Sequence, residues 1–179
     1  MALIILAHPN TTQSIANKTI VDTVSQNLPN SEIRNIHQYY HNYNIDVKAE
    51  QAALLRHDFI VLQYPMYWYN MPAILKIWFD EVFTYNFAYG SQGDKLKGKK
   101  LLPSLTIGQP EQNFQQNGHF MMVDLLQPVK QSAQYAQMVY LEPILLYGVS
   151  TVSGLSQQTI ADKAHQHSLN LIDRIRQGK

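Results

Sequence analysis

The side chains best suited to chemistry lie in a short aromatic loop, Pro65 to Asn70, which follows an apolar run. That run, Phe59 to Tyr64, is rich in β-branched and aromatic residues, which suits a buried strand. Pro65 ends the run because proline cannot donate to a sheet ladder, and Pro72 begins a helix, where the missing N–H costs nothing. In a parallel α/β sheet, ligands bind at the carboxyl ends of strands. Three aromatic side chains in one loop at that place indicate a flat ring as the ligand.

A core role is the alternative interpretation of these aromatic residues. Three large rings, two of which carry hydroxyl groups, are difficult to bury together in one tight turn. The helix that follows, from Pro72 to Phe83, has its own apolar face and does not need them. We therefore favour a ligand-binding role for the loop.

A second candidate site follows the apolar run Ala2 to Ala7, which is typical of a strand covered on both faces. His8 and Ser14 come next, and a helix is expected from Ile15 to Leu28, with Ser14 as its N-cap. Free N–H groups and the helix dipole make such a helix start an anion site. A capping role alone for Ser14 is the simpler alternative, because serine caps are common.

A third candidate is the polar segment Gly108 to His119, which follows a predicted strand from Leu101 to Ile107. It is too long for a mere connection, so we interpret it as a functional loop. His119 alone would more often be a surface histidine. Its position in this loop makes it the candidate catalytic residue.

The remaining pattern predicts the elements that must position these loops. Further strands and helices are expected at Glu32 to Ile36, Lys48 to Arg56, Asp124 to Tyr140, Pro143 to Val149 and Gln157 to Arg176. Their alternation predicts an α/β fold, a doubly wound parallel sheet of five strands in the order 2-1-3-4-5, with helices on both faces. That order brings the three loops together. An anion site beside aromatic surface suits a phosphate joined to a planar ring, and flavin mononucleotide (FMN) is the obvious candidate.

Composition limits the function classes. The 179 residues are expected to form one domain, and 45% hydrophobic with 15% charged residues indicates a globular chain. A net charge of +1 argues against a nucleic-acid binder, and the absence of cysteine excludes disulfides and thiolate chemistry. His165 and His167 point apart on a helix, so no metal site is expected. Met1 to Ala7 is too short for a membrane span and lacks the features of a signal peptide, so a cytoplasmic location is expected.

The sequence resembles the flavodoxin-like NAD(P)H:quinone oxidoreductases from Leu3 to about Gly148. The motifs that carry the resemblance are His8-Pro9 with Ser14 and Asn17, Tyr64 to Tyr69, Pro72 to Lys76, and Phe87 to Gly90. The branch most similar to it contains the flavoprotein ancillary subunit of glutathione-gated potassium efflux systems.

The resemblance implies an enzyme that reduces a bound flavin with NAD(P)H and then passes the hydride to a quinone or similar acceptor, by a two-electron ping-pong route. FMN is the implied cofactor, with FAD possible, and the implied assembly is a homodimer whose substrate site lies between two subunits. One alternative is a regulatory flavoprotein docked on a potassium efflux transporter. A flavodoxin-type electron carrier is another, although such carriers are typically acidic and this chain carries +1.

The resemblance also implies roles for individual residues. The phosphate would be held by His8 and the turn Ser14, Ile15, Ala16 and Asn17. The flavin ring would lie against Pro65, Met66, Tyr67, Trp68 and Tyr69, largely through backbone N–H groups, and against Thr106, Ile107, Gly108 and Gln109. His119 would sit beside the substrate. Phe114 stands where some relatives have a tyrosine that works with this histidine, so His119 would act without that hydroxyl.

Overall fold

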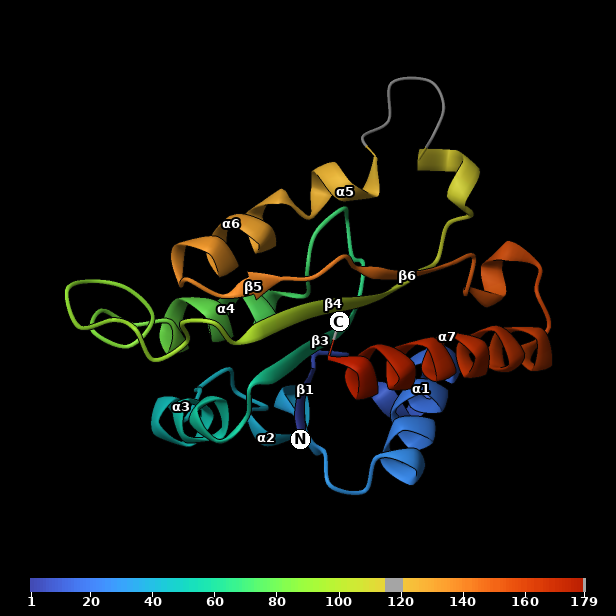
Figure 1. Ribbon diagram of the computed structural model, residues 1–179. Helices are drawn as coiled ribbons and strands as arrows, with labels where there is room; N and C mark the ends of the chain where they lie inside the picture. The colour runs from blue at the N-terminus through green and yellow to red at the C-terminus, as the bar shows by residue number, and fades with distance from the viewer. Residues whose placement is uncertain (115–120, 179) are drawn as a thin grey trace.

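The fold is built on a parallel β-sheet, which a computed structural model describes together with its helices over residues 1–114 and 121–178 (Figure 1). The strands are β1 (Ala2–Leu6), β2 (Glu32–Asn35), β3 (Phe59–Pro65), β4 (Lys100–Ile107), β5 (Val139–Tyr140) and β6 (Ile144–Tyr147). Their order is β2-β1-β3-β4-β5. The last strand, β6, also pairs with β4, nearer to the carboxyl end of β4 than β5 does. All these pairs are parallel. The predicted fold and strand order are confirmed, with one additional short strand.

Helices cover both faces of the sheet. They are α1 (Ile15–Asn27), α2 (Ile36–Tyr39), α3 (Val47–Arg56), α4 (Ala73–Val82), α5 (Met122–Leu125), α6 (Gln127–Tyr135) and α7 (Gln157–Gln177), with 3-10 turns η1 (Thr11–Gln13), η2 (Glu111–Phe114) and η3 (Thr151–Ser153). Within the described ranges, none of the helices combines the length and apolar character needed to cross a membrane.

The two faces of the sheet have separate cores because side chains alternate along each strand. Ile4 of β1 and Val61 of β3 pack against α1 and α7 on one face. Ile5 and Leu62 face the opposite way, into a larger core that includes α3, α4 and α6. In Figure 1, α1 and α7 accordingly lie together on one side, away from α4 and α6. A strand buried on both faces must be apolar throughout, which explains the continuous run at β1.

One predicted helix is partly wrong. We expected a helix from Asp124 to Tyr140, whereas α6 ends at Tyr135 and the chain then enters β5. Gln137 adopts a left-handed φ of 59°, which a continuing helix does not allow. Val139 is 46% exposed, and its N–H donates to the Lys99 carbonyl at 2.9 Å. Sheet pairing therefore overrides helix periodicity in this segment.

A buried carboxylate ties together the elements on the larger-core side. Glu50 of α3 is fully buried, and its Oε1 accepts hydrogen bonds from Arg34 Nη2 and the Tyr40 hydroxyl, both at 2.6 Å. Its Oε2 accepts from Trp78 Nε1 at 2.9 Å. Burial, together with the hydrogen bond to this carboxylate, raises the pKa of Tyr40 to about 12, so the hydroxyl remains a donor. Glu50 thus joins β2, α3 and α4.

We expect Glu50→Ala to lower the free energy of unfolding by about 3–5 kcal/mol, because it removes the buried carboxylate that accepts hydrogen bonds from Arg34, Tyr40 and Trp78. Urea denaturation followed by circular dichroism would measure the change. Asp80→Ala is the control, since it removes an exposed pair with Lys76 on α4 and should cost less than about 1 kcal/mol. Equal stability losses for the two variants would show that the buried pair is not a structural anchor.

Candidate functional site

The carboxyl ends of β3, β4 and β6 open into one cavity of about 460 Å³, here called the aromatic cavity. Its lining comes from the loops that follow these strands: Met66, Trp68, Tyr69, Ile107, Gly108, Gln109, Pro110, Phe114, Ser150 and Val152. Most of this surface is apolar, and a cavity of this kind with a few polar groups is the usual form of a small-molecule site. Its size and aromatic walls suit a planar ring.

A second cavity of about 340 Å³, the polar cavity, lies at the start of α1. It is lined by His8, Asn10, Gln13, Ser14, Ile15, Ala16, Tyr67, Val149, Ser150, Thr151 and Ile160. Ser150 lines both cavities, and Tyr67 is the sequence neighbour of two residues of the aromatic cavity. The two cavities therefore adjoin, and a ligand with a ring and a polar tail could occupy both.

The aromatic loop forms a two-residue hairpin turn. Tyr67 and Asn70 exchange backbone hydrogen bonds of 2.9 Å in both directions. Between them, Trp68 and Tyr69 have φ values of 46° and 63°. Positive φ at both central residues defines a type I′ turn, which asparagine and glycine favour and bulky residues do not. Each such aromatic residue costs on the order of 1–2 kcal/mol, and strain of this kind is concentrated at functional sites.

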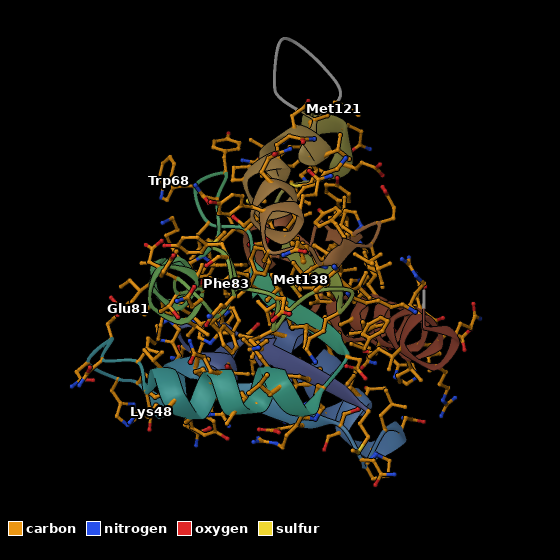
Figure 2. All side chains as sticks on the ribbon, turned by 60° about the vertical axis from the view of Figure 1, so that its left-hand side comes forward. Lys48, Trp68, Glu81, Phe83, Met121 and Met138 are labelled. Atoms are coloured by element: carbon orange, nitrogen blue, oxygen red, sulfur yellow. The ribbon has the colours of Figure 1, made fainter. Side chains whose placement is uncertain are left out.

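The two central residues of this turn, Trp68 and Tyr69, have backbone N–H groups that a ligand could use. The Met66 N–H donates to the Thr106 carbonyl at 2.8 Å, and the Tyr67 N–H donates to Asn70. Among the described residues, no acceptor is found for the N–H groups of Trp68 and Tyr69. Both residues line the aromatic cavity, and the Trp68 side chain is 94% exposed at the edge of the molecule (Figure 2). A ring in this cavity would therefore find its backbone donors at the strained positions.

His8 contributes a neutral donor to the polar cavity. The Asn10 N–H donates to His8 Nδ1 at 3.0 Å, so the ring hydrogen of neutral His8 is on Nε2. Burial, and to a lesser degree the nearby His37, lower the pKa of His8 below its usual value. Near neutral pH the ring therefore offers a hydrogen bond and not a full charge.

Ser14 caps α1, as predicted. Its Oγ accepts from the Asn17 N–H at 3.2 Å and from Asn17 Nδ2 at 3.1 Å. No acceptor for the Ser14 hydroxyl hydrogen is found within residues 1–114 and 121–178. The cap therefore leaves that hydrogen available, so capping and anion binding are compatible at this residue.

Not every predicted residue reaches a cavity. Asn17, Pro65 and Thr106 line neither, and the Asn17 amide instead donates to Thr106 Oγ1 at 2.9 Å. Asn17 and Thr106 are both buried, so we interpret them as residues that support the cavity lining without being part of it. His119 lies outside the described residues.

The loop after β6 was missed by the sequence analysis, although it lines both cavities. It contributes Val149, Ser150, Thr151 and Val152. The sequence does contain a signal for this loop. The predicted order places the fifth strand beside the fourth, so the loops after these two strands should lie close together. The segment from Gly148 to Gly154 is also rich in glycine, serine and threonine, which is typical of a loop at the end of a strand.

Comparison with known proteins agrees with this geometry. A family described by its flavodoxin-like fold matches residues 1–171. An uncharacterised NAD(P)H oxidoreductase, YdeQ, of Bacillus subtilis (strain 168) is 39% identical over 92% of this chain and 83% of its own. The ancillary protein KefF of a glutathione-regulated potassium-efflux system from Enterobacter sp. (strain 638) is 39% identical over 97% of this chain and 96% of its own.

Two solved structures are similar over nearly the whole chain. General stress protein 14 from Treponema denticola, in complex with FMN, has a TM-score of 0.84 at 34% identity and covers 96% of this chain and 97% of its own. An NADPH-quinone reductase from P. pentosaceus has a TM-score of 0.75 at 30% identity and covers 94% of this chain and 97% of its own.

The strained turn generates a test of the backbone geometry. We expect Trp68→Gly to be more stable than Trp68→Ala by about 1 kcal/mol, because only glycine adopts positive φ without a steric penalty. Chemical denaturation of both variants would measure the difference. At exposed Lys76 in α4, the same pair of substitutions should give the opposite order, with alanine more stable by about 1 kcal/mol. A more stable Trp68→Ala would contradict a left-handed conformation at Trp68.

Proposed function

This chain belongs to the flavodoxin-like family, and on that premise we propose that it is a flavin-dependent NAD(P)H oxidoreductase that reduces quinones or similar acceptors. The observation that carries the proposal is the aromatic cavity that adjoins a polar cavity at a helix start. Relatives named as an NAD(P)H oxidoreductase and an NADPH-quinone reductase support the activity.

The two cavities fit the two parts of FMN. The phosphate would lie in the polar cavity, where His8 Nε2–H, the Ser14 hydroxyl and the first N–H groups of α1 offer donors. The ring would occupy the aromatic cavity. FMN ends in a single phosphate, which suits a site at one helix start, and the FMN complex of the Treponema denticola relative supports this choice over FAD.

When bound, the flavin would supply the redox chemistry by accepting a hydride from NAD(P)H and passing it to the acceptor in a second half-reaction. The chain would supply position and charge stabilisation. Trp68 and Tyr69 line the cavity, and their N–H groups would act as preorganised donors for negative charge that develops on the ring edge. Phe114 and Ile107, which are buried apolar residues of the same lining, would exclude water from the ring. The catalytic role of His119 remains a prediction.

Reconstitution tests the proposal directly. Protein incubated with excess FMN and then desalted should retain a stoichiometric amount of yellow flavin and should oxidise NAD(P)H when a quinone is added. Heat release of the cofactor, followed by chromatography, distinguishes FMN from FAD. A protein that stays colourless after incubation with either cofactor would rule out the enzyme.

We also propose a homodimer. Aromatic residues are enriched at protein interfaces, and this chain exposes several of them, including Tyr39 at 50%, Tyr85 at 61% and Tyr135 at 71%. Sedimentation equilibrium at micromolar concentration should therefore give about twice the chain mass. A stable species of 20.6 kDa would contradict the dimer.

Regulation of a potassium efflux transporter is the second candidate function. It is favoured by the relative named KefF, which matches almost the entire chain. Docking on a transporter and flavin chemistry are compatible, because the first uses an outer surface and the second uses the two cavities. Co-purification with a transporter of the same cell would support this role, and its absence at native expression levels would count against it.

A further inference from the structure

A chain of side-chain hydrogen bonds runs through the interior from the polar cavity to α7. Asn17 Nδ2 donates to Ser14 Oγ at 3.1 Å, and Gln63 Nε2 donates to Asn17 Oδ1 at 2.9 Å. Ser104 Oγ donates to Gln63 Oε1 at 2.7 Å and lies 2.7 Å from His167 Nε2. These residues come from α1, β3, β4 and α7, so one path connects four elements.

The path crosses a largely apolar layer. Gln63 and Ser104 are fully buried, and Asn17 and His167 are nearly so. Around them, Val61, Leu102 and Leu171 belong to the core between the sheet and the pair α1 and α7. Buried polar groups cost free energy unless they are bonded, and apolar residues could fill the same space. A chain of hydrogen-bonded polar groups differs from apolar packing because it fixes the direction in which each donor points.

The direction follows from counting hydrogens. The Ser104 hydroxyl has one hydrogen, which goes to Gln63, so Ser104 Oγ must accept from His167 Nε2–H. Every donor along the path then points toward Ser14. Ser14 Oγ accepts from both the backbone and the side chain of Asn17, which leaves its own hydrogen for the cavity.

The opposite direction would remove the Ser14 hydroxyl from the donors of the polar cavity. If each amide were reversed, Asn17 Oδ1 would face Ser14, and the Ser14 hydroxyl would donate inward to it. Ser14 Oγ would then present only lone pairs to the polar cavity, and these repel an anion. The two directions require different tautomers of His167 at the far end of the path. Burial lowers the pKa of His167 to about 4, so near neutral pH the ring carries a single hydrogen. That hydrogen lies on Nε2 in the donating direction.

We propose that Gln63, Ser104 and His167 are positioning residues that orient the Asn17 amide and thereby hold the Ser14 hydroxyl as a donor to an anionic phosphate in the polar cavity. None of the three lines either cavity. The identity of the anion, the flavin phosphate, rests on the proposed function. The direction of the path does not depend on it.

The test compares FMN with riboflavin, which has the same ring and no phosphate. A charge-assisted bond typically contributes about 10-fold or more to affinity, so Ser14→Ala should weaken FMN binding by that factor. Ser104→Ala keeps the Ser14 hydroxyl and releases its orientation, so we expect a smaller loss of FMN affinity, about 3- to 10-fold. Riboflavin affinity should be unchanged in both variants. Fluorescence quenching would give both dissociation constants.

Ser168→Ala is the matched control. Ser168 is also fully buried on α7, and its hydroxyl donates to the Ala164 carbonyl at 2.7 Å, outside the path. The ratio of FMN to riboflavin affinity should match that of the parent in this variant. His167→Gln, which keeps an N–H in reach, should preserve more of the ratio than His167→Leu. If Ser104→Ala lowered both affinities equally, the path would be a packing feature and the proposal would be wrong.

The tautomer of His167 provides a second test that needs no flavin. Nitrogen-15 NMR of histidine-labelled protein at neutral pH should show the Nε2–H form of His167. A ring with its hydrogen on Nδ1 would overturn the proposed direction. If the parent failed to bind flavin while His167 carried its hydrogen on Nε2, the proposed function would fail and the direction of the path would stand.

Discussion

The register between β3 and β4 is the constraint on which the site depends. The ladder pairs Phe59 with Lys100 at one end and Pro65 with Thr106 at the other, and it places Gln63 beside Ser104. Side chains alternate with a period of two, so a slip of one residue between the strands would place Gln63 and Ser104 on opposite faces of the sheet. The same ladder continues through the Met66 N–H, which sets the point at which the aromatic loop leaves the sheet.

The other end of the aromatic loop is fixed by a contact in the larger core, on the face of the sheet that carries α3 and α4. Trp78 on α4 donates to buried Glu50, so the helix that follows the turn is tied to α3. Ladder and helix together fix both ends of the loop and over-determine its conformation. This is the condition under which aromatic residues can be kept at positive φ, as they are at Trp68 and Tyr69. The strain is thus supported by packing and hydrogen bonds that lie outside the site.

Much of this arrangement could be predicted from local pattern. The alternation of strands and helices predicts the sheet order, and Ser14 predicts the start of α1. The sequence also makes the aromatic loop a candidate site, and the structure places this loop beside a cavity. The break at Gln137 was not predictable, because it arises from pairing of Val139 with the far side of β4. Nor could local sequence assign Tyr67 to the polar cavity and Trp68 to the aromatic one, since the turn that separates them opposes local preference.

The hydrogen-bond path shows why the other features of the site could not be predicted from the sequence. Gln63 interrupts an apolar strand, which is a visible sequence signal, but nothing near it in sequence indicates a partner. Its neighbours in the path are 46 residues away on one side and 41 on the other. The features that break local rules, a polar glutamine in a buried strand and aromatic residues in a left-handed turn, lie in one strand and the loop directly after it. Natural sequences depart from locally consistent choices chiefly at functional sites. The concentration of these departures at one end of β3 is therefore an argument, independent of any relative, that ligand binding has shaped this part of the chain.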